Sequence, residues 1–562
     1  MSDRTFNLLD EPWVSVRYLD GGTGELGLVG LFREAHMIAA LSGEMPTQDV
    51  AIQRLLLAVL RRAIHSAVDD ADDLSTYWGE LHRSERLPDE EISTYLERYR
   101  DRFDLCSREY PFMQVPGDTA SKHSGLQKII ADLPDSEDKQ LFTTRAGQGA
   151  ARLGLAEAAR WLVHVHAFDP SGIKTGLVGD SRVKGGKGYP SKGAGLAWSG
   201  NCGIIMARGE TLKESLLLNL VLSNLDPNDL PPWELPQDGP GIREVKRGVP
   251  AQPIGPTQAM TWQSRRVILH FDEGFHAVVN VTIGNGDPVP PQNQWAIEDH
   301  TAWRYSANQS KKGLDVFFPA GADPERRFWR GISGVLAVEP TRGRVVSKAP
   351  PRQAPGVVSW LASLVDGQAL TKGQFVPLVL TGAVYGTQNS MIDTTVSDEL
   401  TLPAAVLHNL SLRHSAVNAV SDAESAVVVL RGLARDLCRA AGVNDTDGAA
   451  DDASRRAYAA LERSYRGWLL TLLPDADRDL REQAWQRQVR DVVRGVAVEL
   501  VRDAGSAALV GRAVKRMGSD AVDHLDVGSS WGRFEWGLRR ALTNLGKGAS
   551  VPEPSVKEHS DG

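Results

Sequence analysis

The C-terminal part of the chain constrains the fold most, because its apolar residues recur three and four positions apart over long stretches. In an α-helix this spacing gathers apolar side chains into one stripe, which is buried against other helices. Helices are expected near residues 420–437, 453–473, 478–504, 507–517 and 530–545. Because short connections favour antiparallel neighbours, residues 401–546 are predicted to form a four-helix bundle.

The first 400 residues mix short strand patterns with helices. The clearest helix covers 47–65, where Ile52, Leu56 and Leu60 lie on one apolar stripe. A second helix is expected over 153–166, and strands over 202–207, 275–283 and 375–381. The predicted fold class is therefore α+β, with a large mixed domain over 1–400, the bundle over 401–546 and a polar tail over 547–562 that we expect to be disordered.

Composition excludes several classes of protein. Apolar residues make up 42% of the chain and charged residues 24%, which is typical of a globular protein with a sizeable core. The three cysteines, Cys106, Cys202 and Cys438, form no closely spaced pair, which excludes a cysteine-rich zinc site and fits a reducing compartment. No apolar run approaches the ~18–20 residues of a membrane span, so we expect a cytoplasmic protein without a membrane partner.

Residues 171–200 form a glycine- and lysine-rich segment without apolar periodicity, so neither a helix nor an ordinary strand is expected there. Nine of its thirty residues are glycine, and five basic side chains face one acid, Asp180. Glycine lets a backbone approach a partner closely, and lysine supplies positive charge, so the segment suits a polyanion. A flexible surface loop with solvating charge is the alternative. Since the net charge of the whole chain is −8, nucleic-acid binding would depend on such a local patch or on partners.

Three further features carry candidate functional residues. A turn at 385–389 between two strand-prone runs projects Gln388 and Asn389, whose amides are of the kind that read base edges; a solvated hairpin tip is the alternative. Phe142 lies in a polar stretch where an aromatic ring can stack on a base, or can plug the loop onto the core. His164 and His166 are two positions apart on a predicted helix and point in different directions, so they are interpreted as packing or surface residues.

Catalytic signatures are mostly absent from the sequence. The glycine-rich segment has no G-x-x-x-x-G-K-[ST] pattern, and no H-E-x-x-H or G-x-S-x-G occurs elsewhere. A non-catalytic binding protein without a cofactor is therefore favoured. The alternative hypothesis is a phosphate-handling enzyme that uses the Gly/Lys-rich segment as a nucleotide cradle.

Five sequence islands occur in a characteristic order. They are NLLDEPWVSV at 7–16, EYPFMQV at 109–115, LFTTRAGQG at 141–149, ARGETLKESLLLNL at 207–220 and YGTQNS at 385–390. In this order they resemble the CasA family, the large subunits of the type I-E CRISPR surveillance complex, Cascade. The resemblance covers nearly the whole chain, including the helical C-terminal part.

The resemblance implies a role in antiviral defence. Family members recognise the protospacer-adjacent motif (PAM) of double-stranded target DNA through the minor groove, help to start R-loop formation and present the site to a helicase–nuclease. The implied partners are the other Cascade subunits, the CRISPR guide RNA, target DNA with its PAM and the helicase–nuclease.

The resemblance also implies site residues. Phe142 matches the aromatic of the guide-proximal loop, which also contains Gln148. Gln388 matches a glutamine wedge that enters the duplex beside the PAM, with Thr387 and Asn389 as neighbours. The family's glycine loop falls within 185–195, and the candidate DNA-binding residues there, chosen by their chemistry, are Lys184, Gly186, Lys187, Gly188, Lys192 and Gly193. A family lysine that reaches the minor groove has no match in 284–294.

Overall fold

The computed structural model describes residues 5–117, 122–133, 151–189, 195–247, 249–311, 313–341, 352–444, 446–475, 477–515 and 522–546. The chain divides into two compact units, one of residues 1–338 and 348–408 and the other of residues 339–347 and 409–562. The expected domain boundary at residue 400 falls inside strand β16 (Ile392–Pro403), which is paired along its length with β15 (Phe375–Tyr385). The division lies at Asn409 instead, because a paired strand belongs with its sheet. The tail over 547–562 lies outside the described residues.

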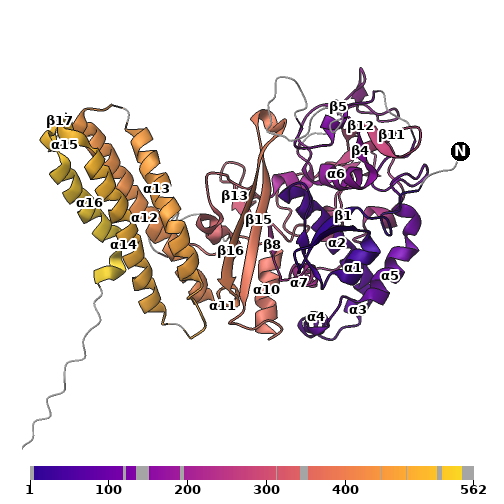
Figure 1. The fold of residues 1–562 in the computed structure, drawn as a ribbon, viewed down its shortest axis with the longest axis horizontal. Coiled ribbons are helices and arrows are strands. Elements are labelled where there is room, and N and C mark those ends of the chain that lie inside the picture. The colour runs from indigo at the N-terminus through magenta and orange to yellow at the C-terminus, as the bar shows by residue number, and fades with distance from the viewer. Residues whose placement is uncertain are drawn as a thin grey trace, which may run out of the picture. The chain divides into compact units, whose positions relative to one another are not determined.

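The first unit is organised around helix α2 (Pro46–Ala63), the indigo helix at the centre of its part of Figure 1. The predicted helix over 47–65 is confirmed, and almost every residue from Val50 to Leu60 is buried. Pro46 begins the helix at a position where a missing N–H costs nothing. Helix α6 (Leu155–Phe168) packs against α2 and confirms the helix predicted over 153–166.

Two antiparallel sheets of the first unit support the candidate site. One has the strand order β16-β15-β8, with β8 at Ile204–Ala207, and β15 and β16 form a long hairpin. The other has the order β11-β12-β4, with β11 at Arg265–Phe271, β12 at Ala277–Asn285 and β4 at Leu153–Gly154. The strands expected over 202–207, 275–283 and 375–381 are confirmed, although β15 extends to Tyr385.

The glycine-rich segment differs from the prediction, because it contains a small antiparallel sheet with the order β5-β7-β6. Strands β6 (Val183–Lys184) and β7 (Lys187–Gly188) are joined by Gly185 and Gly186, whose φ angles are 56° and 73°. Two successive residues with positive φ make the tight turn that suits a two-residue hairpin, and β5 (Lys174–Thr175) pairs with the other edge of β7. The prediction failed because strands of two residues show no apolar periodicity. The Gly185–Gly186 pair was the one sequence signal of a hairpin turn in β6–β7.

The remaining elements of the first unit are shorter. An N-terminal sheet has the order β2-β1-β3, formed by Thr23–Leu26, Val14–Tyr18 and Ile38–Leu41. The other strands are β9 (Glu244–Lys246), β10 (Val249–Pro250), β13 (Trp303–Tyr305) and β14 (Phe317–Pro319). The other helices are α1 (Leu28–Glu34), α3 (His65–Asp69), α4 (Leu74–Arg83), α5 (Asp89–Arg98), α7 (Leu212–Leu218), α8 (Pro256–Met260), α9 (Ile332–Leu336), α10 (Gly356–Asp366) and α11 (Ala404–His408).

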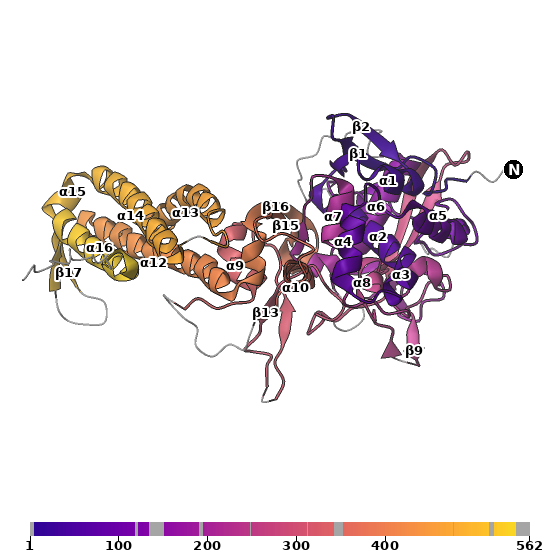
Figure 2. The same ribbon diagram turned by 90° about the horizontal axis from the view of Figure 1, so that it is seen from below.

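The second unit contains four long helices that lie side by side in Figures 1 and 2. They are α12 (Leu410–Ala441), α13 (Asp447–Leu469), α14 (Arg478–Asp503) and α16 (Val527–Ala541), and α12 packs against each of the other three. Tyr465, Trp468 and Trp485 meet in its core with ring centroids 5.4–5.8 Å apart. No helix in the described ranges combines the length and the apolar character needed to cross a bilayer.

One helix predicted in this unit is wrong in part. The pattern over 507–517 predicted a single helix, but α15 covers only Gly505–Val510. Gly511 then adopts a φ of 69°, and the chain continues as strand β17 (Arg512–Lys515), which pairs with β18 (Val522–Leu525). A side chain at position 511 would collide with the carbonyl oxygen of Leu525, so glycine is required at this reversal.

Candidate nucleic-acid interface

The tip of the β15–β16 hairpin exposes Thr387, Gln388 and Asn389 to solvent. The tip is closed by backbone hydrogen bonds from Gly386 N–H to the Met391 oxygen (3.1 Å) and from Asn389 N–H to the Gly386 oxygen (2.9 Å). Gln388 and Asn389 both have left-handed backbone conformations, with φ of 59° and 55°. This turn holds the Gln388 amide at the end of two long paired strands.

The small sheet of the glycine-rich segment presents Lys184 and Lys187 on either side of the exposed Gly185–Gly186 turn. Gly188 is buried in this sheet, and a Cβ there would lie 3.2 Å from the Thr175 carbonyl oxygen. The segment thus carries its charge on a hairpin with a defined turn.

Two side chains of the β11–β12 sheet hold the base of this segment. Arg265, on β11 and 3% exposed, donates to the main-chain oxygens of Asp169, Pro170 and Gly195 at 2.9–3.1 Å. The amide of Asn285 donates to the oxygens of Gly172 (3.3 Å) and Gly188 (3.0 Å). Arg265 bonds the two residues just before the segment and Gly195 near its end. It therefore holds the beginning and the end of the segment close together.

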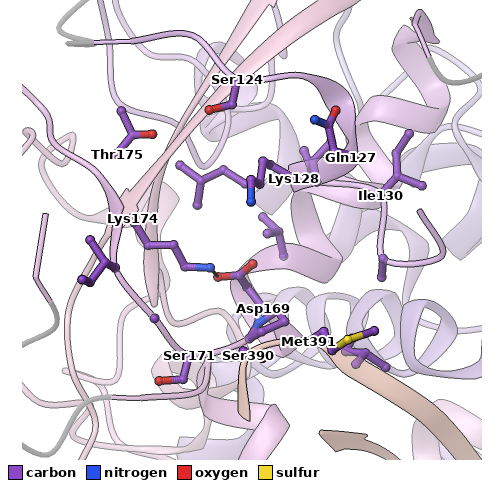
Figure 3. A pocket seen from close by; sticks show the side chains of 18 of the residues that line it. Ser124, Gln127, Lys128, Ile130, Asp169, Ser171, Lys174, Thr175, Ser390 and Met391 are labelled. Atoms are coloured by element: carbon purple, nitrogen blue, oxygen red, sulfur yellow. Dashed lines mark ion pairs between the residues drawn. The ribbon is translucent and has the colours of Figure 1, made fainter. Parts of the chain in front are cut away.

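A cavity of about 490 Å³ lies between the hairpin and the segment. Its walls come from residues 122–133, 164–175, 186–187 and 390–392, with Ile283 of β12. Figure 3 shows Lys128 and Lys174 directed into it from two sides, with Ser390 and Met391 of the hairpin along one edge. Gly186 and Lys187 also border the cavity, so the structure brings the glycine-rich segment and the hairpin together.

The described lining of the cavity carries more positive than negative charge, in a protein of negative net charge. Among the described residues that line it, Lys122, Lys128, Lys174 and Lys187 face a single carboxylate, Asp169. This charge balance favours an anionic group, such as a phosphate, over a cation.

Asp169 is shared by two cations. The ammonium of Lys174 lies 2.5 Å from its carboxylate, and the buried guanidinium of Arg265 also donates to it. Burial raises the pKa of Asp169, but these two cations outweigh that effect and hold the pKa below its usual range. Burial also lowers the pKa of Lys174, although its pairing with Asp169 opposes that shift. Two cations on one carboxylate leave an excess of positive charge beside the cavity.

The predicted histidines are both buried. His164 lies 3.0 Å from the Thr47 hydroxyl, and His166 lies 2.8 Å from the Met113 oxygen. Burial lowers the pKa of each to about 4, so both are neutral near pH 7. Within the described part of the chain, no group of three or more His, Cys, Asp or Glu side chains is arranged to hold a metal ion.

The structure therefore places some of the expected site residues and leaves others outside its described ranges. Lys184, Lys187 and Gly188 lie in strands of the small sheet and Gly186 lies in its turn, while Thr387, Gln388 and Asn389 form the hairpin tip. Phe142, Gln148, Lys192 and Gly193 lie outside the described residues.

Sequence reasoning missed several residues that build this region. Nothing in the sequence linked Lys128 or Asp169 to the candidate site, and the contact of Tyr385 with Phe168 had no sequence signal although Tyr385 lies in the turn expected at 385–389. Arg265 and Arg266 are adjacent basic residues in the sequence, but they are 3% and 1% exposed and make internal ion pairs.

The two units first define the class of protein, an α+β protein with a basic cavity beside the tip of a long hairpin and with a separate helical bundle. The chain belongs to the family described as CRISPR-associated protein Cse1, whose sequence profile matches residues 7–496. The family membership expected from the five sequence islands is thus confirmed.

Individual relatives agree with this membership. The chain is 31% identical over 333 residues to the CRISPR-associated protein CasA/Cse1 of Thermus thermophilus, an alignment that spans 59% of this chain and 60% of that protein's length. The crystal structure of Thermobifida fusca Cse1 is similar at 38% identity and a TM-score of 0.82, over 96% of this chain and 97% of that one. A chain of a CRISPR RNA-guided surveillance complex shares the fold at 19% identity and a TM-score of 0.62, over 88% of this chain and 99% of that one.

Proposed function

We propose that this chain is the large subunit of a type I-E CRISPR surveillance complex and that it recognises the PAM of double-stranded target DNA. Membership of the Cse1 family supports the first part, and the fold shared with a chain of a surveillance complex is consistent with it. Its partners in this proposal are the other Cascade subunits, the guide RNA and a helicase–nuclease recruited after R-loop formation. The chain itself supplies recognition and strand opening without catalysis.

The observation that carries the proposal is the position of Gln388. The exposed tip of a hairpin whose strands pair over eleven residue positions can enter a duplex without bending, and its amide can take over hydrogen bonds from a separated base. The basic cavity beside the hairpin tip is suited to the phosphates of the DNA that the tip opens. Duplex capture and strand opening would thus occur on one face of the first unit.

The geometry of the glycine-rich segment argues against the alternative, a nucleotide cradle. A phosphate-binding glycine loop works by leading into a helix whose N-terminal N–H groups face the phosphates. Here Gly185 and Gly186 form the turn of a short antiparallel hairpin, and strand β7 follows them. We therefore expect no ATP- or metal-dependent turnover from the purified chain.

A selection experiment tests the proposal. The complex is reconstituted with a guide RNA, with or without this chain, and each assembly captures duplexes from a library with a randomised PAM. The complete complex is expected to enrich a restricted set of PAM sequences, whereas the complex without the chain should enrich none. Equal enrichment by the two assemblies would refute PAM recognition by this subunit.

A further inference from the structure

Tyr385 is the last residue of β15 and directly precedes the hairpin tip. Its hydroxyl donates a hydrogen bond of 2.7 Å to the carbonyl oxygen of Phe168, the last residue of α6. The final carbonyls of a helix have no donor within the helix, so this bond satisfies one of them. Burial raises the pKa of the Tyr385 phenol well above its usual value, so the hydroxyl remains a donor throughout the physiological pH range.

The space around the Tyr385 hydroxyl has no room for a side chain at position 200. Gly200 closes the glycine-rich segment, and a Cβ at that position would lie 2.4 Å from the Tyr385 hydroxyl oxygen. Any larger residue would push the phenol away from Phe168. The hydroxyl is therefore enclosed between the end of α6 and the end of the glycine-rich segment.

A second hydrogen bond holds the other side of the tip, which leads into β16. The N–H of Ser171 donates to the carbonyl oxygen of Asn389 at 2.9 Å. Phe168 and Ser171 flank Asp169 and Pro170, whose main-chain oxygens are bonded to the buried Arg265. The two bonds to the tip thus end on a short stretch of chain that is itself fixed to the β11–β12 sheet.

We propose that Tyr385 is a positioning residue for strand opening: its bond to Phe168 sets the height and direction of the tip, and so of Gln388, relative to the basic cavity. This proposal rests on the proposed function of the chain. Without the bond, the tip keeps its own turn and the link through Ser171, but the β15 side can pivot about its last strand pairs. Gln388 would then meet the base pair in the productive position less often.

The test uses Tyr385→Phe in the complete complex, because this change removes only the hydroxyl. Loss of one hydrogen bond predicts R-loop formation on linear DNA that is roughly 2- to 10-fold slower, with PAM-duplex affinity within about 2-fold of the original. A bubble already opened beside the PAM should restore the rate. A normal rate on linear DNA, or equal slowing on the bubble, would overturn the proposal.

Tyr465→Phe is the matched control. Tyr465 also donates to a main-chain oxygen, that of Ala416 at 3.0 Å, but within the second unit. Loss of the Tyr465 hydroxyl is expected to lower thermal stability without changing the ratio of the R-loop formation rates on linear and bubble DNA. If Tyr465→Phe changes that ratio as much as Tyr385→Phe does, the effect is general destabilisation and the positioning role is refuted.

Combined variants separate this proposal from the proposed function. If Tyr385 acts through Gln388, the variant carrying both Tyr385→Phe and Gln388→Ala should be no slower than Gln388→Ala alone; multiplied effects would refute this. A slow Gln388→Ala with a normal Tyr385→Phe would overturn only the positioning role, whereas a normal Gln388→Ala would overturn the wedge itself.

Gly200→Ala provides a second perturbation, and its effect should shrink in the Tyr385→Phe background, where the colliding oxygen is gone.

Discussion

Ser171 donates its backbone N–H to the carbonyl oxygen of Asn389 across 2.9 Å, and this bond joins the start of the glycine-rich segment to the hairpin tip. The two residues are far apart in the chain, yet each borders a candidate site that the sequence indicated separately. Their contact means that the tip and the segment form one surface. A ligand that engages both would meet them in a fixed relative position.

The first prediction concerns the wedge. Opening the base pair next to the PAM disrupts a stacking step worth on the order of 1–2 kcal/mol, which an inserted amide can partly offset. Gln388→Ala should leave PAM-duplex binding nearly unchanged but slow R-loop formation on linear targets. Negative supercoiling or a pre-opened bubble should restore the rate, measured by strand-separation fluorescence, because each supplies the opening energy independently.

Gln368→Ala is the control for this variant. Gln368 is also exposed and also has a left-handed backbone conformation, with a φ of 60°, but it follows α10. Its replacement should not alter the rate on any of the substrates. Gln388 is not the wedge if its alanine variant is normal on linear DNA or equally slow on the bubble.

The second prediction concerns the charge of the cavity. Replacing Lys128 and Lys187 together by Gln should weaken duplex capture by the complex. Each lost phosphate contact should reduce the slope of log K against log salt by about 0.9, so the pair should reduce it by about 1.8. Titrations at several salt concentrations measure this slope.

A matched pair of exposed lysines controls for net charge. Lys246 on β9 and Lys372 before β15 are exposed and do not line the cavity. Replacing both by Gln removes the same charge from the chain and should leave the slope unchanged. Identical slopes for the two double variants would show that the cavity lysines make no special contact with phosphate.

The third prediction concerns pH and His164. Burial lowers its pKa from 6.5 to about 4, and the nearby Asp169 and Glu44 carboxylates only partly oppose this shift. Between these two values the unfolded chain binds a proton that the native state does not, so stability is lost as the pH falls through this window. His164→Gln should reduce the loss of unfolding free energy between pH 7 and pH 5 by about 2 kcal/mol.

Urea titrations at the two pH values measure this difference. Thr47→Val removes the hydrogen-bond partner of His164 without removing a titrating group, so it should change stability but retain the pH dependence. Parallel pH profiles for the original protein and His164→Gln would contradict the assignment.

The fourth prediction concerns the second unit. We propose that residues 409–546 fold independently, since α12 packs against α13, α14 and α16. The side chain of Asn409 also caps the N-terminus of α12. The isolated fragment should be helical by circular dichroism and should melt cooperatively. Extending it to residue 401 should add no stability, because 401–408 belong to the first unit. A weakly helical fragment that melts without cooperativity would refute independent folding.

The sequence alone determined the elements whose signal is local and long. The apolar stripe of α2 and the seams of the bundle helices extend over many turns, so their periodicity predicted helices that the structure confirms. The family could also be recognised, because its islands keep their order. Where the signal was short, the prediction failed: two-residue strands around Gly185 and Gly186, and the hairpin after Gly511, depend on backbone conformations that apolar periodicity does not report.

The tertiary structure alone decided how the candidate site is assembled. The contact of Tyr385 with Phe168 spans 217 positions, and that of Arg265 with Asp169 spans 96. Neither pair has a spacing that marks it, because such contacts arise only when β15 and β11 are brought against the end of α6. Buried polar groups must be paired, so the fold selects their partners from whatever the packing brings near. The charge of the cavity has the same origin: Lys122, Lys128, Lys174 and Lys187 come from three segments of the chain, and only their convergence makes a basic site in an acidic protein.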